Sequence, residues 1–157
     1  MGYFNLELLK PISPMFFDDK KRSICILSSS QILKILLPER QINKKIYLSF
    51  DSLINNLKGK NWIIEYIYWE IFLIKELGFE MDFFNIKKTI GTIKKNFELN
   101  GKYYKIPDLY LEKKDKKFSN QAIKEALIFN KSLLMENFIS PNYIKIPVSR
   151  NLLESYY

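Results

Sequence analysis

Histidine and cysteine, on which many catalytic and metal sites depend, are nearly absent from this chain. The 157 residues include no histidine and one cysteine, Cys25, within an apolar run that favours a buried structural thiol. This composition excludes an intramolecular disulfide, histidine-based acid–base catalysis and the usual Cys/His zinc sites. Asp18 and Asp19 have no evident acidic partners, so a helix cap suits them better than hydrolysis. The sequence also offers no nucleophile–base pair, Walker loop or metal cluster, and we expect no enzyme activity, no cofactor and no metal.

Glu70 is a carboxylate set among apolar residues. On a helical wheel its neighbours are Tyr66, Leu73, Ile74 and Leu77. A lone buried carboxylate is costly unless it is paired or protonated. Arginine is scarce in a chain rich in lysine, which suggests sites that need a planar, bidentate donor. We predict that Arg40 or Arg150 reaches Glu70 in a structural ion pair; the alternative is an exposed Glu70.

A second group of charged residues lies in the middle of the chain. Between Lys87 and Lys117, ten lysines stand against four acidic residues. We predict that eight of them form one exposed basic face: Lys87, Lys88, Lys94, Lys95, Lys113, Lys114, Lys116 and Lys117. Such a face would neutralise a nucleic-acid backbone.

The net charge of +8 and the pI of about 9.4 favour the same anionic partner. A genome rich in A and T would also raise the lysine content without any binding role, and this alternative stays open. Tyr103, Tyr104 and Tyr110 are interleaved with the lysines. They could stack on bases, or they could simply pack on neighbouring helices.

The residues around Glu70 require a buried helix to position them. Residues 61–79 are apolar on nearly every side, with Asn61 suited to cap the helix and Gly78 suited to end it. Charged residues interrupt this segment too often for it to span a bilayer. We expect it to be the core helix of a single domain.

Other helices are predicted around this core. One runs from a cap at Asp18 or Asp19 to about Leu37, with its inward face formed by Ile24, Leu27, Gln31, Ile32, Ile35 and Leu36. A second runs from about Asn43 to Gly59, and its inward stripe is Ile46, Tyr47, Phe50, Leu53, Ile54 and Leu57. It should pack antiparallel to the core helix.

The remaining elements follow from capping and turn signals. Asn100-Gly101 predicts a β-hairpin. Ser119 caps a helix that reaches about Ile139, and a last helix covers 147–156. Residues 3–9 alternate as a strand does, although one strand is not stable alone. The fold class is therefore mainly α: a helical bundle around a central buried helix, a small β-hairpin and basic loop insertion, and one leftover N-terminal strand.

Several segments together resemble the family of the DNA repair protein RecO. They are residues 2–8 (Gly-Tyr-Phe-Asn-Leu-Glu-Leu), 36–40 (Leu-Leu-Pro-Glu-Arg), 69–70 (Trp-Glu), 77–79 (Leu-Gly-Phe) and 147–153 (Pro-Val-Ser-Arg-Asn-Leu-Leu). No one segment is specific, but their order and spacing are. The resemblance implies a RecO-like helical domain over residues 15–157, including a basic hairpin and loop region at 83–118.

The chain departs from the family pattern in two respects. In that family an OB-fold domain precedes the helices, and residues 1–10 resemble only a remnant of its last strand. Many members also carry cysteines after the Leu-Gly-Phe segment, some of them binding zinc, and this chain has none there. A zinc site is therefore not carried over.

The resemblance implies an accessory protein of homologous recombination, in the RecF pathway. Such proteins bind single- and double-stranded DNA, anneal complementary strands and help to load recombinase, working with RecR and single-strand-binding protein. The alternative is a protein-interaction domain that docks to RecR or single-strand-binding protein with little DNA binding of its own. The sequence shows no signal peptide or membrane span, so we expect a cytoplasmic protein. We expect no membrane association.

Overall fold

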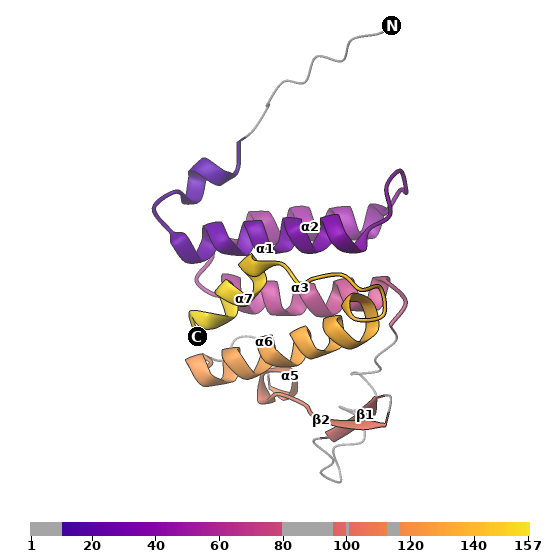
Figure 1. Cartoon of the computed structure of the whole chain (residues 1–157). Helices are drawn as coiled ribbons and strands as arrows, with labels where there is room; N and C mark the ends of the chain where they lie inside the picture. The colour runs from indigo at the N-terminus through magenta and orange to yellow at the C-terminus, as the bar shows by residue number, and fades with distance from the viewer. Residues whose placement is uncertain (1–10, 80–95, 100, 113–116) are drawn as a thin grey trace, which may run out of the picture.

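The computed structural model describes residues 11–79, 96–99, 101–112 and 117–157 as a mainly helical domain (Figure 1). Its longer helices are α1 (Lys20–Leu36), α2 (Lys44–Asn56), α3 (Trp62–Glu76), α6 (Asn120–Leu134) and α7 (Val148–Ser155). Shorter helical turns are η1 (Ser13–Phe16), α5 (Asp108–Leu111) and η2 (Met135–Ile139). The predicted fold class, a helical bundle around a central helix, is confirmed.

The first three long helices, α1, α2 and α3, alternate in direction. Arg22, in the first turn of α1, donates to the carbonyl oxygens of Leu57 at 2.6 Å and Gly59 at 3.1 Å, which fixes the turn between α2 and α3. At the other end, Lys45 of α2 pairs with Glu76 of α3 at 3.4 Å. These contacts make α2 antiparallel to both of its neighbours in sequence.

Helix ends follow the predicted caps with one exception. The Asp19 carboxylate accepts from the amide of Arg22 and begins α1, and Ser119 accepts from the amide of Ala122 and begins α6. Gly78 has φ +97°, a left-handed conformation that glycine adopts at no steric cost, and it follows the end of α3. Asn61 occupies the cap position of α3, but its side chain makes no capping hydrogen bond, so that detail of the prediction is wrong.

The predicted inward face of α1 is also partly wrong. Leu27 is exposed, whereas the buried residues are Cys25, Ser28, Ser29 and Ile32. The serines can be buried because both hydroxyls are satisfied. Ser28 lies 2.8 Å from the Tyr66 hydroxyl, and Ser29 donates to the Cys25 carbonyl at 2.8 Å. Both small polar side chains are therefore buried without an unpaired group, Ser28 through Tyr66 of α3 and Ser29 through the backbone of α1 itself.

A hairpin lies below the bundle in Figure 1, as its turn signal predicts. Strands β1 (Asn96–Leu99) and β2 (Lys102–Lys105) pair antiparallel, with Phe97 opposite Tyr104. Gly101 has φ +75° in the connecting turn. The short helix α5 that follows was not predicted, and it buries Leu109 and Tyr110.

The last two helices close the core around α3. Helix α6 continues through one wider turn, η2, to Ile139, the predicted end. Helix α7 packs on α1, where Ser149 donates to Gln31 at 2.7 Å. Among the described residues, no helix is long and apolar enough to cross a membrane. The strand predicted at 3–9 lies outside the described residues, and so does half of the predicted basic hairpin and loop region at 83–118.

Candidate functional site

The Arg150 guanidinium binds the Glu70 carboxylate at the centre of the domain. Arg150 Nε donates to Glu70 Oε1 at 2.5 Å, and Nη2 donates to Oε2 at 3.0 Å. Both side chains are fully buried, so the bidentate pair is shielded from water. Nη2 also donates to the Leu127 carbonyl of α6 at 2.7 Å. One side chain of α7 thus joins α3 and α6.

Other polar groups complete the surroundings of this carboxylate. The Tyr66 hydroxyl donates to Glu70 Oε1 at 2.7 Å and also meets Ser28 of α1. Asn130 of α6 donates to Glu70 Oε2 at 3.2 Å and to the Ile67 carbonyl at 2.9 Å. Tyr110 of α5 donates to Asn130 Oδ1 at 2.5 Å. We call Ser28, Tyr66, Glu70, Tyr110, Asn130 and Arg150 the buried polar network; it links five helices.

Burial and the Glu70 charge shift the pKa values of the surrounding groups. Burial raises the pKa of Tyr66 and of Tyr110 well above 10.0, and the nearby Glu70 carboxylate adds to the effect. The same two causes raise the pKa of the buried Cys25 thiol. Burial alone would lower the pKa of Arg150, but the Glu70 carboxylate outweighs it and the pKa is raised. Arg150 therefore stays charged and both phenols stay neutral near pH 7.

Of the two arginines expected at Glu70, Arg150 is the one that reaches it. Arg40 is exposed in the turn after α1, with φ +62°, and makes no hydrogen bond with Glu70. The sequence reasoning did not identify Asn130, Tyr66, Tyr110 or Ser28 as partners. Asn130 could have been found, because it is a polar residue on the apolar stripe between Leu127 and Leu134. A fully buried network admits no substrate, so its role is structural.

The structure places one of the eight predicted DNA-binding lysines. Lys117 is exposed, two residues before the Ser119 cap of α6. The other seven, Lys87, Lys88, Lys94, Lys95, Lys113, Lys114 and Lys116, lie outside the described residues. Of the three tyrosines, Tyr103 is 74% exposed and free to stack, whereas Tyr110 is buried and the Tyr104 ring packs edge-on against Phe129.

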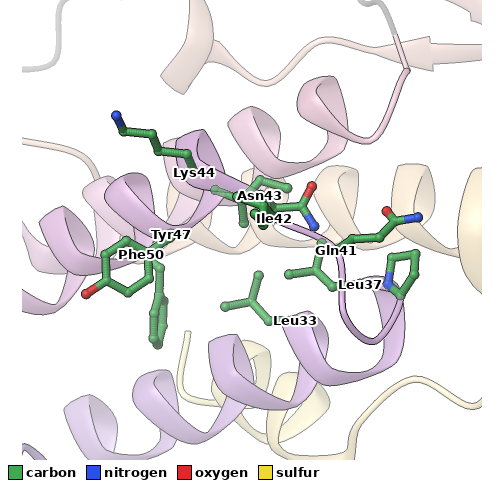
Figure 2. Close-up of a pocket in the computed structure, with 10 residues that line it drawn as sticks. Leu33, Leu37, Gln41, Ile42, Asn43, Lys44, Tyr47 and Phe50 are labelled. Carbon is green, nitrogen blue, oxygen red and sulfur yellow. The ribbon is translucent and has the colours of Figure 1, made fainter.

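An open apolar groove of about 570 Å³ lies between α1 and α2 (Figure 2). Figure 2 shows Leu33 of α1 and Phe50 of α2 facing each other across it, with Ile42 and Gln41 closing one end. Ile42 is 97% exposed and Tyr47 is 69% exposed. Tyr47 was predicted on the inward stripe of α2. It lines this groove instead, and most of its ring is left uncovered.

The described residues hold no group of three or more cysteine or acidic side chains that could bind a metal ion. Charged residues near the groove are Lys44, which extends away from it in Figure 2, and Glu39 and Arg40 in the turn. The arrangement suits binding to a macromolecule through apolar contact or surface charge.

One known protein family matches this domain. The family model described as "Recombination protein O C terminal" matches residues 18–124, well over half of the chain. The chain belongs to the RecO C-terminal family. The match includes α1, α2, α3, the β-hairpin, α5 and the start of α6, and therefore contains Glu70 of the buried polar network but not Arg150.

Relatives of this RecO domain carry the same family name. The chain is 37% identical over 84 residues to the DNA repair protein RecO of Ehrlichia chaffeensis, covering 52% of this chain and 34% of that protein. It is 33% identical over 100 residues to the DNA repair protein RecO of a Wolbachia species from Drosophila simulans, covering 62% and 41%. The chain thus matches less than half of the length of these relatives. No solved structure matches it significantly.

Proposed function

We propose that this RecO domain serves DNA repair and homologous recombination as a DNA-binding accessory protein without enzyme activity of its own. In this role it binds single- and double-stranded DNA, anneals complementary strands and helps to load recombinase, with RecR and single-strand-binding protein as partners. The observation that carries the proposal is the family match over residues 18–124, together with relatives whose name is DNA repair protein RecO.

The charge of the chain supports the DNA part of this proposal. The net charge is +8, and several lysines of the described residues are exposed without an acidic partner. Lysines that neutralise phosphates release condensed counterions, which supplies most of the non-specific affinity of a DNA-binding protein. Tyr103, exposed beside the hairpin turn, adds an aromatic surface on which a base can stack.

Strand annealing tests this function directly. Two complementary oligonucleotides, one with a fluorophore and one with a quencher, are mixed at low salt with and without the chain. The proposal expects faster quenching with the chain than with an unrelated protein of similar net charge. Equal rates with the two proteins would overturn the annealing function.

The groove between α1 and α2 favours a second candidate function, docking to RecR or single-strand-binding protein with little DNA binding. Exposed apolar side chains in a concave site are typical of protein-recognition surfaces. The groove is lined by Leu33, Leu37, Ile42, Tyr47 and Phe50, and these residues offer such a surface.

Two substitutions on α2 test the docking function. Tyr47→Asp places a charge in the groove, whereas Leu48→Asp places one at an exposed apolar position of the same helix that does not line it. Docking through the groove predicts that only Tyr47→Asp weakens binding to RecR or single-strand-binding protein in calorimetric titrations. Equal effects of the two variants would exclude the groove.

A further inference from the structure

Several basic side chains lie at one end of the bundle, away from the groove. Helices α1, α3 and α6 all begin at this end (left in Figure 1), and α2 finishes there. Lys20 is the first residue of α1, and Lys58 and Lys60 lie in the turn between α2 and α3. All three are exposed, and none forms an ion pair. We call Lys20, Lys58, Lys60 and Phe17 the end face.

Arg22 holds the two basic segments of the end face together. Its guanidinium donates to the carbonyls of Leu57 and Gly59, the residues on either side of Lys58, while it pairs with Asp19. Lys58 and Lys60 are thus fixed beside the first turn of α1. Because Arg22 neutralises Asp19, the exposed carboxylate left at the start of α1 is that of Asp18. The remaining lysines are free to bind phosphates.

Phe17, three residues before Lys20, is displayed by an anchored turn. Phe16 is buried, and its carbonyl accepts from the Ser23 hydroxyl at 2.6 Å and from the Asp19 amide at 2.9 Å. The neighbouring Phe17 side chain is 84% exposed. A large aromatic ring held in water on an ordered turn has no role in the core. Next to unpaired lysines, it has the arrangement that proteins use to stack a base while binding the backbone.

We propose that the end face binds the phosphate backbone of single-stranded DNA through Lys20, Lys58 and Lys60, with a base stacked on Phe17. This proposal rests on the proposed DNA-binding function and assigns it a surface other than the lysine-rich middle of the chain. Lys21 is not included, because its ammonium group already lies 4.5 Å from the centre of the Tyr157 ring and 3.4 Å from the Tyr156 carbonyl.

The test compares two triple variants of the full chain that differ only in which end loses its charge. One is Lys20→Ala with Lys58→Ala and Lys60→Ala. The control is Lys34→Ala with Lys44→Ala and Lys75→Ala, which removes three exposed lysines from the opposite end, in the last turns of α1 and α3 and the first of α2. Fluorescence anisotropy with labelled oligo(dT) gives the affinity of each at several salt concentrations.

The end-face variant is expected to bind oligo(dT) at least about tenfold more weakly at low salt, and to lose about two units of the slope of log K against log salt. The control variant keeps most of the affinity and of the slope. Phe17→Ala should lower affinity about tenfold without changing the slope, and Phe17→Tyr should restore it.

The outcomes separate this inference from the proposed function. If the wild-type chain does not bind oligo(dT) at low salt, the proposed DNA-binding function fails. If the wild type binds but the two triple variants lose equal affinity and equal slope, the end face is not the site and the proposed function stands. An unchanged affinity in Phe17→Ala would overturn the stacked base.

Discussion

At Glu70, the cost of burying a charge competes with the attraction of an opposite charge. Glu70 and Arg150 are both fully buried and joined by two hydrogen bonds. Such a pair contributes little net stability compared with apolar residues of the same size, but leaving one member alone is costly. Arg150 is therefore best understood as a residue that fixes the position of α7 in the core.

Removing one member of this pair is predicted to be strongly destabilising. Glu70→Gln removes the bidentate partner of Arg150 and leaves its buried charge only the Glu154 carboxylate, 3.5 Å from Nη1. Arg150→Met leaves the Glu70 carboxylate buried without a counterion. Each change should lower the free energy of unfolding by about 3 kcal/mol. Urea titrations followed by far-UV circular dichroism measure this change.

The double replacement provides the control. Glu70→Gln combined with Arg150→Met removes both charges, so the two losses should not add. Additive losses would mean that the two residues do not interact.

Alkaline pH is predicted to destabilise the domain through Tyr66 and Tyr110. Both pKa values are raised above 10.0 in the folded state, first by burial and then by the Glu70 carboxylate. Above that pH the unfolded chain releases these protons and the folded chain retains them, so the free energy of unfolding falls as pH rises. Each tyrosine contributes a slope of up to about 1.4 kcal/mol per pH unit.

The free energy of unfolding, measured between pH 8 and pH 11.5, should therefore decline above about pH 10. Below that pH these two tyrosines should not change it. Tyr110→Phe removes one titrating group and should make the decline shallower, even though it also removes the hydrogen bond to Asn130. An identical slope in the variant would show that Tyr110 does not contribute.

At the scale of the helix, local signals predict where an element begins better than they predict which face it buries. The Asp19 and Ser119 caps, Gly78 and Gly101 act through their own backbone or the next few residues, and the sequence is sufficient for them. The buried face of α1 depends on what α3 presents to it. Tyr66 offers a hydroxyl partner, which makes Ser28 a buried residue and leaves Leu27 exposed, and periodicity of apolar residues does not predict this.

The same limit applies to the candidate sites. Apolar neighbours and scarce arginine were enough to predict an arginine partner for Glu70, because a buried charge needs a partner. They did not decide between Arg40 and Arg150; the structure shows that it is Arg150. The groove and the end face could not be predicted, since each joins segments that come together only through the tertiary packing of α1 with the α2–α3 hairpin. Tyr47 was expected in the core because the spacing of apolar residues along α2 does not show which of them the other helices leave uncovered.

The two cap positions predict different costs of substitution. Ser119→Ala removes a side-chain acceptor from the first turn of α6 and should lower the free energy of unfolding by about 1 kcal/mol. Asn61→Ala should cost less than about 0.5 kcal/mol, because the Asn61 side chain makes no capping hydrogen bond on α3. Thermal unfolding of the two variants gives the comparison, and equal losses would contradict the assigned caps.

At the scale of the whole molecule, the helical core separates two surfaces with different chemistry. The buried polar network holds α1, α3, α5, α6 and α7 together, the groove lies between α1 and α2, and the end face lies where α1 and α3 begin (Figure 1). One end is therefore suited to an apolar partner and the other to an anionic one. The proposed DNA binding and the proposed docking to a protein would thus use different surfaces.

The most direct test of this account is the salt dependence of DNA affinity of the intact chain. Anisotropy of labelled oligo(dT) is measured from about 50 to 200 mM salt, the range over which phosphate contacts change affinity steeply. The account predicts binding at the lowest salt and a linear fall of log K with log salt, with a slope of about −2 or steeper, corresponding to three or more phosphate contacts. No binding at low salt, or an affinity that does not change with salt, would contradict the DNA-binding function and favour docking to a protein partner.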